Sequence, residues 1–354
     1  MSRHHSLLLL PVEDLDHVVN AVGHRWEQLR GRRLLLTGGT GFIGKWLLGT
    51  FLHASRKLDL NARIVAVSRQ PASFLQEFPQ LRGAAEIEWI TGDVRDLGKE
   101  AIGECDYAIH AATDVVAANT PASILDTCTT GTRRVLDVMA QGSAPHRVLL
   151  LSSGAVYGRT PPELIAIPEH WAGAPDTLTP ASAYGEGKRV SELLCAMAAA
   201  TRPGLDVAIA RCFAFVGPHL PFDKHFAIGN FIGAAMRNED ICIQGDGTPL
   251  RSYLYAADLA HWLWAMLFDA PSGRAYNVGG AQALSIGELA HRVNCILGGS
   301  GAIRIAQTPR PDIPPQAYIP SIDRIAAELG LLPAYGLDDA ILRTARWAAD
   351  LELT

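Results

Sequence analysis

Residues 34–44 read Leu-Leu-Leu-Thr-Gly-Gly-Thr-Gly-Phe-Ile-Gly, an apolar run that leads into a glycine-rich turn. The run predicts a strand, and the residues that follow predict a helix over 45–54. Small residues let the main chain approach a pyrophosphate, and a helix N-terminus offers it unpaired N–H groups. The segment therefore predicts a dinucleotide-binding turn, with a purely structural glycine turn as the alternative. The residues expected to line the cofactor here are Gly38, Thr40, Gly41, Phe42, Ile43 and Gly44.

Outward from this turn, short apolar runs alternate with longer stretches of helical pattern. The runs are 34–36, 64–67, 87–90, 107–109, 148–151 and 207–210. Uniformly apolar strands that alternate with helices predict an α/β fold, a Rossmann-type doubly wound parallel sheet with helices on both faces.

The texture of the sequence also predicts a domain organisation. Apolar residues at steps of three and four over 12–30 predict an amphipathic helix within an N-terminal helical extension, residues 1–31. We expect the dinucleotide-binding domain to comprise 32–211 and 252–280. The Gly- and Pro-rich remainder, 212–251 and 281–354, predicts a smaller C-terminal substrate-binding lobe.

The second predicted strand ends in Ser68 and Arg69. A fold selective for NAD usually places a carboxylate here, to accept hydrogen bonds from the ribose 2′-hydroxyl. A carboxylate repels a 2′-phosphate, whereas a guanidinium attracts it. The sequence therefore favours NADP over NAD, unless Arg69 is a solvated loop charge that does not distinguish the two.

A second motif combines Tyr184 and Lys188 with Ser153. Helical residues four apart share a face, and an ammonium close to a phenol lowers the pKa of the phenol from about 10. Tyr184 then becomes a usable acid or base. Ser153 follows an apolar strand, at the sheet edge where ligands bind, and can hydrogen-bond a substrate oxygen. An isolated Tyr-x-x-x-Lys is more often an ordinary helix start, so the prediction rests on the combination.

Composition narrows the class of protein. The 354 residues are 48% hydrophobic and 19% charged, with a formal net charge of -5, which argues against nucleic acid or an anionic membrane as partner. The apolar run 7–10 is shorter than a signal peptide core, and no stretch reaches the length of a membrane span, so we expect a cytoplasmic protein. The six cysteines lack metal-ligand spacing, so we expect reduced core thiols and no metal site.

These motifs together resemble the extended short-chain dehydrogenase/reductases, specifically the NAD(P)-dependent nucleotide-sugar epimerase/dehydratase family. The resemblance covers about 32–345 and is specific because the motifs occur in the family's order. Besides the motifs above, the matching residues are Gly92-Asp-Val94, His110-Ala-Ala112, Ser152–Gly158, Arg211, Gly217-Pro218, Gly245-Asp-Gly247, Arg251-Ser-Tyr253, Asp258-Leu-Ala260 and Tyr276-Asn-Val-Gly279.

The resemblance implies roles for individual residues. It implies cofactor contacts from Asp93 and Val94 to adenine, and from Ala111, Ala112 and Thr113 to the ribose and phosphates, with Lys188 also holding the nicotinamide ribose. It implies that Ser153, Tyr184 and Lys188 form the catalytic triad. It implies that Ser153, Asn230, Arg251 and Arg310 bind a nucleotide-diphosphate sugar, the last three at the diphosphate. It also implies a homodimer formed through helices near 122–140 and 183–200.

Three positions depart from the family pattern. Gly154 and Ala155 stand where 4,6-dehydratases carry Asp-Glu, and neither can transfer a proton. Cys128 stands where many members have asparagine, which puts a proton relay through an amide in doubt. Ala214 stands where epimerases usually have asparagine, so contacts to the sugar must differ.

We therefore expect an enzyme of carbohydrate biosynthesis that reduces a nucleotide-linked 4-keto sugar at C4, with Tyr184 giving the proton. The alternative is a nucleotide-sugar 4-epimerase with tightly bound NAD. A 4,6-dehydratase is disfavoured by Gly154 and Ala155, and a non-catalytic cofactor-binding regulator by the intact triad. A reductase of flavonoid-like or steroid-like ketones would have no use for Arg251 and Arg310.

Overall fold

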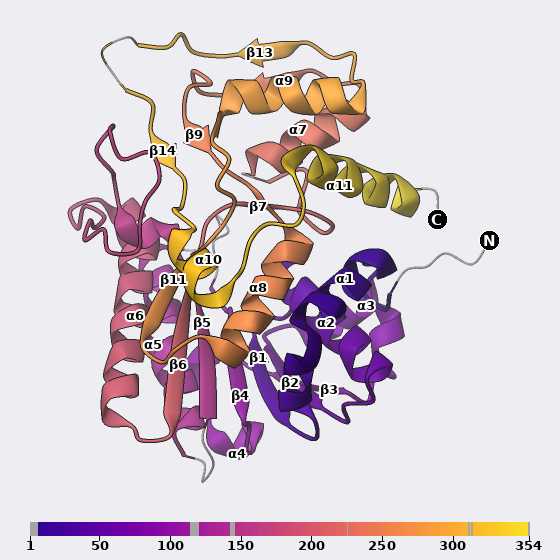
Figure 1. The fold of residues 1–354 in the computed structure, drawn as a ribbon, viewed down its shortest axis with the longest axis vertical. Helices are drawn as coiled ribbons and strands as arrows, with labels where there is room; N and C mark the ends of the chain where they lie inside the picture. Colours follow the sequence, from indigo (N-terminus) through magenta and orange to yellow (C-terminus); the bar gives the residue numbers. More distant parts are fainter. Residues whose placement is uncertain are drawn as a thin grey trace. The chain divides into compact units, whose positions relative to one another are not determined.

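The computed structural model describes residues 6–113, 120–141, 146–224, 226–310, 312 and 314–352. Seven strands form its largest sheet: β1 (Arg33–Thr37), β2 (Arg63–Ser68), β3 (Ile87–Thr91), β4 (Tyr107–His110), β5 (His146–Ser153), β6 (Leu205–Cys212) and β11 (Arg274–Val278). Their spatial order is β11-β6-β5-β4-β1-β2-β3 (Figure 1). Strands β1 to β6 pair in parallel, which confirms the predicted doubly wound α/β fold.

The strand order reverses between β1 and β4. The chain runs outward from β1 through β2 to β3, then returns to the other side of β1 and continues through β4, β5 and β6. In open parallel sheets the crevice at such a reversal, beyond the carboxyl ends of the strands, is where ligands bind. The glycine turn follows β1 directly, so the predicted cofactor residues of that turn, within 38–44, lie at this point of the sheet.

Helices flank the sheet: α2 (Phe42–Lys57), α3 (Pro71–Glu77), α4 (Lys99–Ile102), α5 (Pro121–Met139), α6 (Ala183–Thr201) and α8 (Ala256–Asp269). Alternate strand residues such as Leu35, Val67 and Val148 share a buried cluster with Val135 of α5 and Cys195 of α6. Helices α5 and α6 also pack against one another. They therefore cover one face of the sheet, as the alternation of strand side chains requires.

The N-terminal segment forms α1 (Val12–Val22) followed by the 3-10 helix η1 (Gly23–Leu29). The sequence predicted one helix over 12–30. The α-helix ends earlier because Gly23 adopts a positive φ of 62°. Helix α1 packs on α2, and a Cβ at Gly49 of α2 would lie 2.5 Å from the Leu10 side chain.

The contacts divide the chain into two compact units. Unit 1 comprises Met1–Arg159, Ala172–Cys212 and Ala260–Tyr276, and unit 2 comprises Thr160–Trp171, Phe213–Leu259 and Asn277–Thr354. The segments 160–171, 252–259 and 277–280, which the sequence assigned to the first domain, group with unit 2.

Unit 2 contains three small sheets and four helices within the part of the chain that the structure describes. The remaining strands are β7 (Phe215–Val216), β8 (Ile241–Ile243), β9 (Leu250–Arg251), β10 (Leu254–Tyr255), β12 (Leu284–Ser285), β13 (Ile303–Ile305) and β14 (Ala317–Tyr318). The helices are α7 (Ala227–Met236), α9 (Ile286–Leu297), α10 (Asp323–Leu329) and α11 (Leu337–Glu352).

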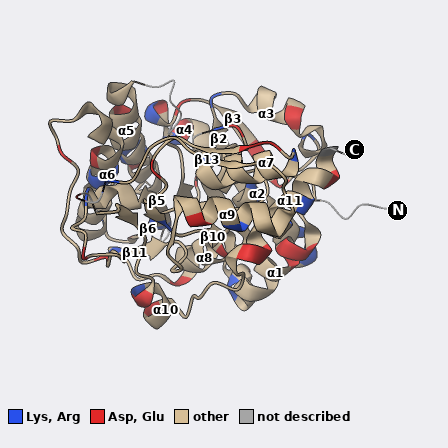
Figure 2. Ribbon diagram, turned by 90° about the horizontal axis from the view of Figure 1, so that it is seen from above, with Lys and Arg blue, Asp and Glu red and all other residues tan. Residues whose placement is uncertain are grey.

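Charged residues of both signs share individual helices. Figure 2 shows acidic and basic residues together on α9 and on α10. Across the described residues, no helix combines the length and apolar character that crossing a membrane would need. All six cysteines are free, and Cys242 and Cys295 are exposed, so the expectation that all six are core residues is wrong for these two.

Candidate cofactor and active site

The glycine turn joins β1 to α2 through contacts that only glycine permits. Gly38 has a positive φ of 74°, and a Cβ there would lie 2.6 Å from the carbonyl carbon of Ala111 at the end of β4. A Cβ at Gly44 would lie 2.3 Å from the main-chain oxygen of Gly38. The turn is therefore tight against both its own helix and the neighbouring strand.

Gly41 is the N-cap of α2, and no side chain caps this helix end. The first N–H groups of a helix have no partner within the helix. Those of Phe42, Ile43 and Gly44 are therefore available to an anion at the switch point of the sheet, where the helix dipole also favours negative charge. The turn fits the pyrophosphate of a dinucleotide.

The ends of β2 and β3 carry the residues predicted at the adenosine. Arg69 is exposed, and the hydroxyl of Ser68 accepts from the main-chain N–H of Gln70 at 3.3 Å. Asp93 caps the short helix η3 (Val94–Asp96). Its electrostatic neighbours include Arg69, whose positive charge helps to lower the pKa of Asp93.

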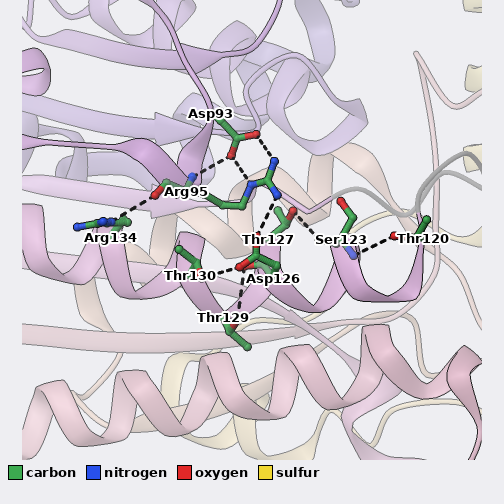
Figure 3. Close-up of polar contacts among 9 residues, drawn as sticks. All are labelled: Asp93, Arg95, Thr120, Ser123, Asp126, Thr127, Thr129, Thr130 and Arg134. Atoms are coloured by element: carbon green, nitrogen blue, oxygen red, sulfur yellow. Dashed lines mark hydrogen bonds and ion pairs between the residues drawn. The ribbon is translucent and has the colours of Figure 1, made fainter.

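The carboxylate of Asp93 is held by Arg95 (Figure 3). Nε of Arg95 donates to Oδ1 at 2.9 Å, and Nη2 donates to Oδ2 at 2.8 Å. The hydrogen bonds from Arg95 keep the pKa of Asp93 below its ordinary value. Arg95 also pairs with Asp126 of α5 at 3.0 Å. The sequence analysis identified neither Arg95 nor Asp126. The Asp-x-Arg spacing was the one signal for the contact between Asp93 and Arg95.

The end of β4 carries a buried imidazole. Nδ1 of His110 lies 2.8 Å from Oγ1 of Thr37, and Nε2 lies 3.1 Å from Oγ1 of Thr132 in α5. Burial lowers the pKa of His110 to about 3, helped by the charge of Lys188, so the ring is neutral. The hydroxyl of Thr37 also accepts from the N–H of Ala112 at 3.2 Å, which links the end of β1 to the predicted cofactor wall.

The predicted catalytic residues lie at the end of β5 and on α6. Ser153 is the last residue of β5 and caps the 3-10 helix η4 (Gly154–Tyr157), accepting from the N–H of Ala155 at 3.1 Å. Lys188 is buried, and its ammonium donates to the main-chain oxygen of Leu151, two residues before Ser153, at 2.7 Å. Nζ lies 6.0 Å from the centre of the Tyr184 ring. Burial lowers the pKa of Lys188.

A polar network supports this end of β5 from α6 and β6. The hydroxyl of Ser152 donates to Glu192 at 2.6 Å, and Arg211 donates to the same carboxylate and to the Tyr157 hydroxyl, the latter at 2.8 Å. Sequence reasoning missed Glu192. Its signal was available, because Glu192 follows Lys188 by four residues and so shares its helix face.

Cys128, Gly154 and Ala155, which depart from the family pattern, lie close to the start of α6. A Cβ at Gly187 would lie 3.1 Å from Sγ of Cys128, so the thiol packs directly on α6. A Cβ at Gly185 would lie 2.7 Å from the oxygen of Ala155. The segment after Ser153 is therefore pressed onto the start of α6, and residues 154 and 155 bring no acid to it.

The predicted substrate residues Asn230, Arg251 and Arg310 all belong to unit 2. Asn230 lies on α7, its side-chain oxygen is buried without a hydrogen-bond partner among the described residues, and it lines a pocket with Phe231 and Gln244.

The two arginines predicted to bind the substrate differ in their surroundings. The Arg251 side chain donates to the oxygen of Leu250 at 2.8 Å, and burial lowers its pKa. Arg310 is exposed and acts electrostatically on Asp246.

Comparison with known proteins agrees with the fold and the motifs. UDP-glucuronic acid decarboxylase 1 of Xenopus tropicalis is 28% identical over 320 residues, 89% of this chain and 72% of that protein. A dTDP-glucose 4,6-dehydratase of Streptomyces griseus is 28% identical over 329 residues, 89% and 93% of the two chains. The solved structure of an epimerase from Methanothermobacter thermautotrophicus superposes with a TM-score of 0.77 at 23% identity, covering 94% of this chain and 96% of that one. The model of the NAD dependent epimerase/dehydratase family matches residues 34–279, and the chain belongs to that family.

Proposed function

We propose that the chain catalyses hydride transfer between a nicotinamide cofactor and C4 of a nucleotide-linked sugar, in the direction of 4-keto-sugar reduction. The observation that carries the proposal is the position of Lys188. Its buried ammonium is tied to the end of β5 beside Ser153 and lies one helical turn from Tyr184. Ser153 ends β5, which pairs with β4, and β4 borders the switch point at which the glycine turn offers its N–H groups.

Each side chain then has a definite task. A bound reduced nicotinamide supplies the hydride. The phenol of Tyr184 gives a proton to the C4 oxygen, because the Lys188 ammonium stabilises the phenolate that remains. The hydroxyl of Ser153 donates a hydrogen bond to the same oxygen while negative charge develops on it.

The choice of a nucleotide-linked substrate rests on two kinds of support. The relatives named above are a UDP-glucuronic acid decarboxylase and a dTDP-glucose dehydratase, so their names specify nucleotide sugars. In this chain, Arg251 and Arg310 of unit 2 are guanidinium groups suited to phosphate oxygens, and Asn230 brings an amide. We assign all three to the diphosphate.

The direction of the reaction and the choice of NADP rest on Ser68 and Arg69. An exposed guanidinium at the end of β2 suits a 2′-phosphate, and an exchangeable NADPH suits net reduction. Gly154 and Ala155 provide no acid, so elimination of water has no support in this site.

A second candidate is a redox-neutral reaction with tightly held NAD, because the family is NAD-dependent and the relatives include a decarboxylase. Oxidation at C4 followed by reduction from the other face gives 4-epimerisation. Oxidation at C4 of a uronic acid would give a β-keto acid, which loses carbon dioxide without an enzymic acid, and return of the hydride to the resulting C4 ketone would restore NAD.

One set of measurements separates the candidates. Native mass spectrometry identifies any nicotinamide that copurifies, and the protein is then given a panel of UDP- and dTDP-linked 4-keto sugars with NADPH. We expect NADPH to be consumed in proportion to reduced sugar, and Tyr184→Phe to abolish it. Conversion of UDP-glucose or UDP-glucuronic acid without added cofactor would instead support the second candidate. Tight cofactor binding with no turnover by any route would contradict both.

We also propose that the chain forms a homodimer through α5 and α6. Both helices carry exposed apolar side chains, with Leu125 of α5 exposed to 39% and Leu193 of α6 to 60%. Apolar side chains on one face of a helix pair are suited to packing against a second copy.

A further inference from the structure

The ammonium of Lys188 has two acceptors among the described residues. One is the main-chain oxygen of Leu151, and the other is the hydroxyl oxygen of Thr113, at 2.6 Å. Thr113 lies three residues after the end of β4, and Leu151 lies in the neighbouring strand β5. Because Lys188 is buried, each lost acceptor makes its charged form less stable. The titratable groups that act on it are Cys128 of α5, Cys212 of β6, Glu192, Cys195 and Tyr184 of α6, and His110 of β4.

The hydroxyl of Thr113 is itself oriented. It donates its hydrogen to the main-chain oxygen of Ala112 at 2.7 Å, which leaves a lone pair for the ammonium. The Cys128 thiol of α5 interacts with Lys188 and with the Thr113 hydroxyl, but it is a poorer acceptor for the ammonium than that hydroxyl is. A thiol is a weak acceptor, and burial raises the pKa of Cys128, so it is a neutral group beside Lys188.

We propose that Thr113 is a positioning residue, whose hydroxyl oxygen accepts a hydrogen bond from the Lys188 ammonium and so holds it near the Tyr184 ring. The inference rests on the proposed function for its catalytic consequence. Removal of the hydroxyl leaves Lys188 with the Leu151 oxygen alone. Its positive charge is then harder to maintain, and the phenolate of Tyr184 loses support.

The test compares Thr113→Val, which removes the hydroxyl, with Thr113→Ser, which keeps it. Thr127→Val is the matched control, because the Thr127 hydroxyl on α5 donates only to its own helix, at the Ser123 oxygen. In the reductive direction, activity falls at alkaline pH as Tyr184 loses its proton. We expect Thr113→Val to move this alkaline limb up by about one pH unit and to lower kcat/KM about tenfold. Thr127→Val should match the parent, and Thr113→Ser, which keeps the acceptor for Lys188, should keep the alkaline limb at the parental pH.

A second readout needs no substrate. The phenolate absorbance of the holoprotein is titrated with pH, and the part that depends on Tyr184 is found by subtracting the Tyr184→Phe variant. We expect this part to appear at higher pH in Thr113→Val and at the parental pH in Thr113→Ser. Unchanged titration in Thr113→Val, or equal shifts in Val and Ser, would overturn the inference. Shifted titration with no turnover of any sugar would contradict the proposed function while leaving the role of Thr113 intact.

Discussion

Two nitrogens of Arg211 donate hydrogen bonds to the carboxylate of Glu192: Nη2 lies 2.7 Å from Oε2, and Nε lies 3.0 Å from Oε1. The exposed fractions of the two side chains are only 16% and 12%. Loss of one partner leaves the other charge in a place with little water. We therefore expect Glu192→Ala to lower the free energy of unfolding by about 2–3 kcal/mol, below the full cost of a completely buried pair because some water remains. Urea denaturation measures this change.

The pair Arg237–Glu239 supplies the control, because its side chains are 53% and 56% exposed. Water screens this pair, so Glu239→Ala should leave the free energy of unfolding almost unchanged. Equal losses in the two variants would mean that the charge on Glu192 is no better sheltered than one on the surface.

A second prediction concerns Arg69. If its guanidinium receives a 2′-phosphate, Arg69→Ala should weaken NADPH binding about tenfold and leave NADH binding unchanged, because only NADPH carries that phosphate. Fluorescence titration of both nucleotides gives the two dissociation constants. Arg63→Ala is the control, since Arg63 is the first residue of β2, at the other edge of the sheet. Equal weakening of both nucleotides by Arg69→Ala would assign Arg69 to adenine rather than to the phosphate.

The fold was predictable from local patterns, because strands β1 to β6 each coincide with one of the six predicted runs and the glycine turn has a fixed spacing. The site was predictable only where a motif is local in sequence. Tyr184 and Lys188 share a helix face, and Ser153 ends a strand. The contacts from Arg95 to Asp126 and from Arg211 to Glu192 join elements that meet only after folding. No periodicity in one segment encodes such pairs.

A third prediction concerns pH. The pKa of His110 is about 3 in the folded chain and about 6.5 in an unfolded one. Between these values, the unfolded chain binds a proton that the folded chain does not, so the free energy of unfolding falls as pH falls, by about 1.4 kcal/mol per pH unit. We expect His110→Gln to flatten this dependence between about pH 6 and pH 4, an interval that lies between the two pKa values. Urea denaturation over a pH series measures the slope.

His261 provides an internal comparison, because burial lowers its pKa to about 4 with the same sign of effect. His261→Gln should flatten the slope as well, and the double variant should flatten it further. A slope that His110→Gln leaves unchanged would show that the imidazole takes up a proton within the folded chain.

A fourth prediction follows from the contacts drawn in Figure 3. Arg95 fixes the carboxylate of Asp93, which we assign to adenine, so Arg95→Met should let Asp93 turn away and weaken cofactor binding about fivefold. The pKa of Asp93 should also rise toward its ordinary value, because the hydrogen bonds from Arg95 are the main cause of its lowering. Calorimetric titration with the cofactor measures the affinity. Asp126→Asn, which changes the partner of Arg95 on α5 and the acceptor of the Thr130 hydroxyl but leaves the contacts between Arg95 and Asp93, should have a smaller effect. An effect equal to that of Arg95→Met would mean that the ion pair with α5 matters more than the hydrogen bonds to Asp93.

The last prediction concerns the proposed homodimer. Leu193 and Met197 are exposed to 60% and 55% and lie one turn apart on α6, so they form one apolar face of that helix. A buried glutamate without a partner costs several kcal/mol, so Leu193→Glu combined with Met197→Glu should separate the subunits. Sedimentation velocity compares the variant with the parent, and Leu178→Glu is the control because Leu178, exposed to 91%, lies outside α5 and α6. A dimer that survives the double change must use another surface, and a monomeric parent would remove the proposed assembly altogether.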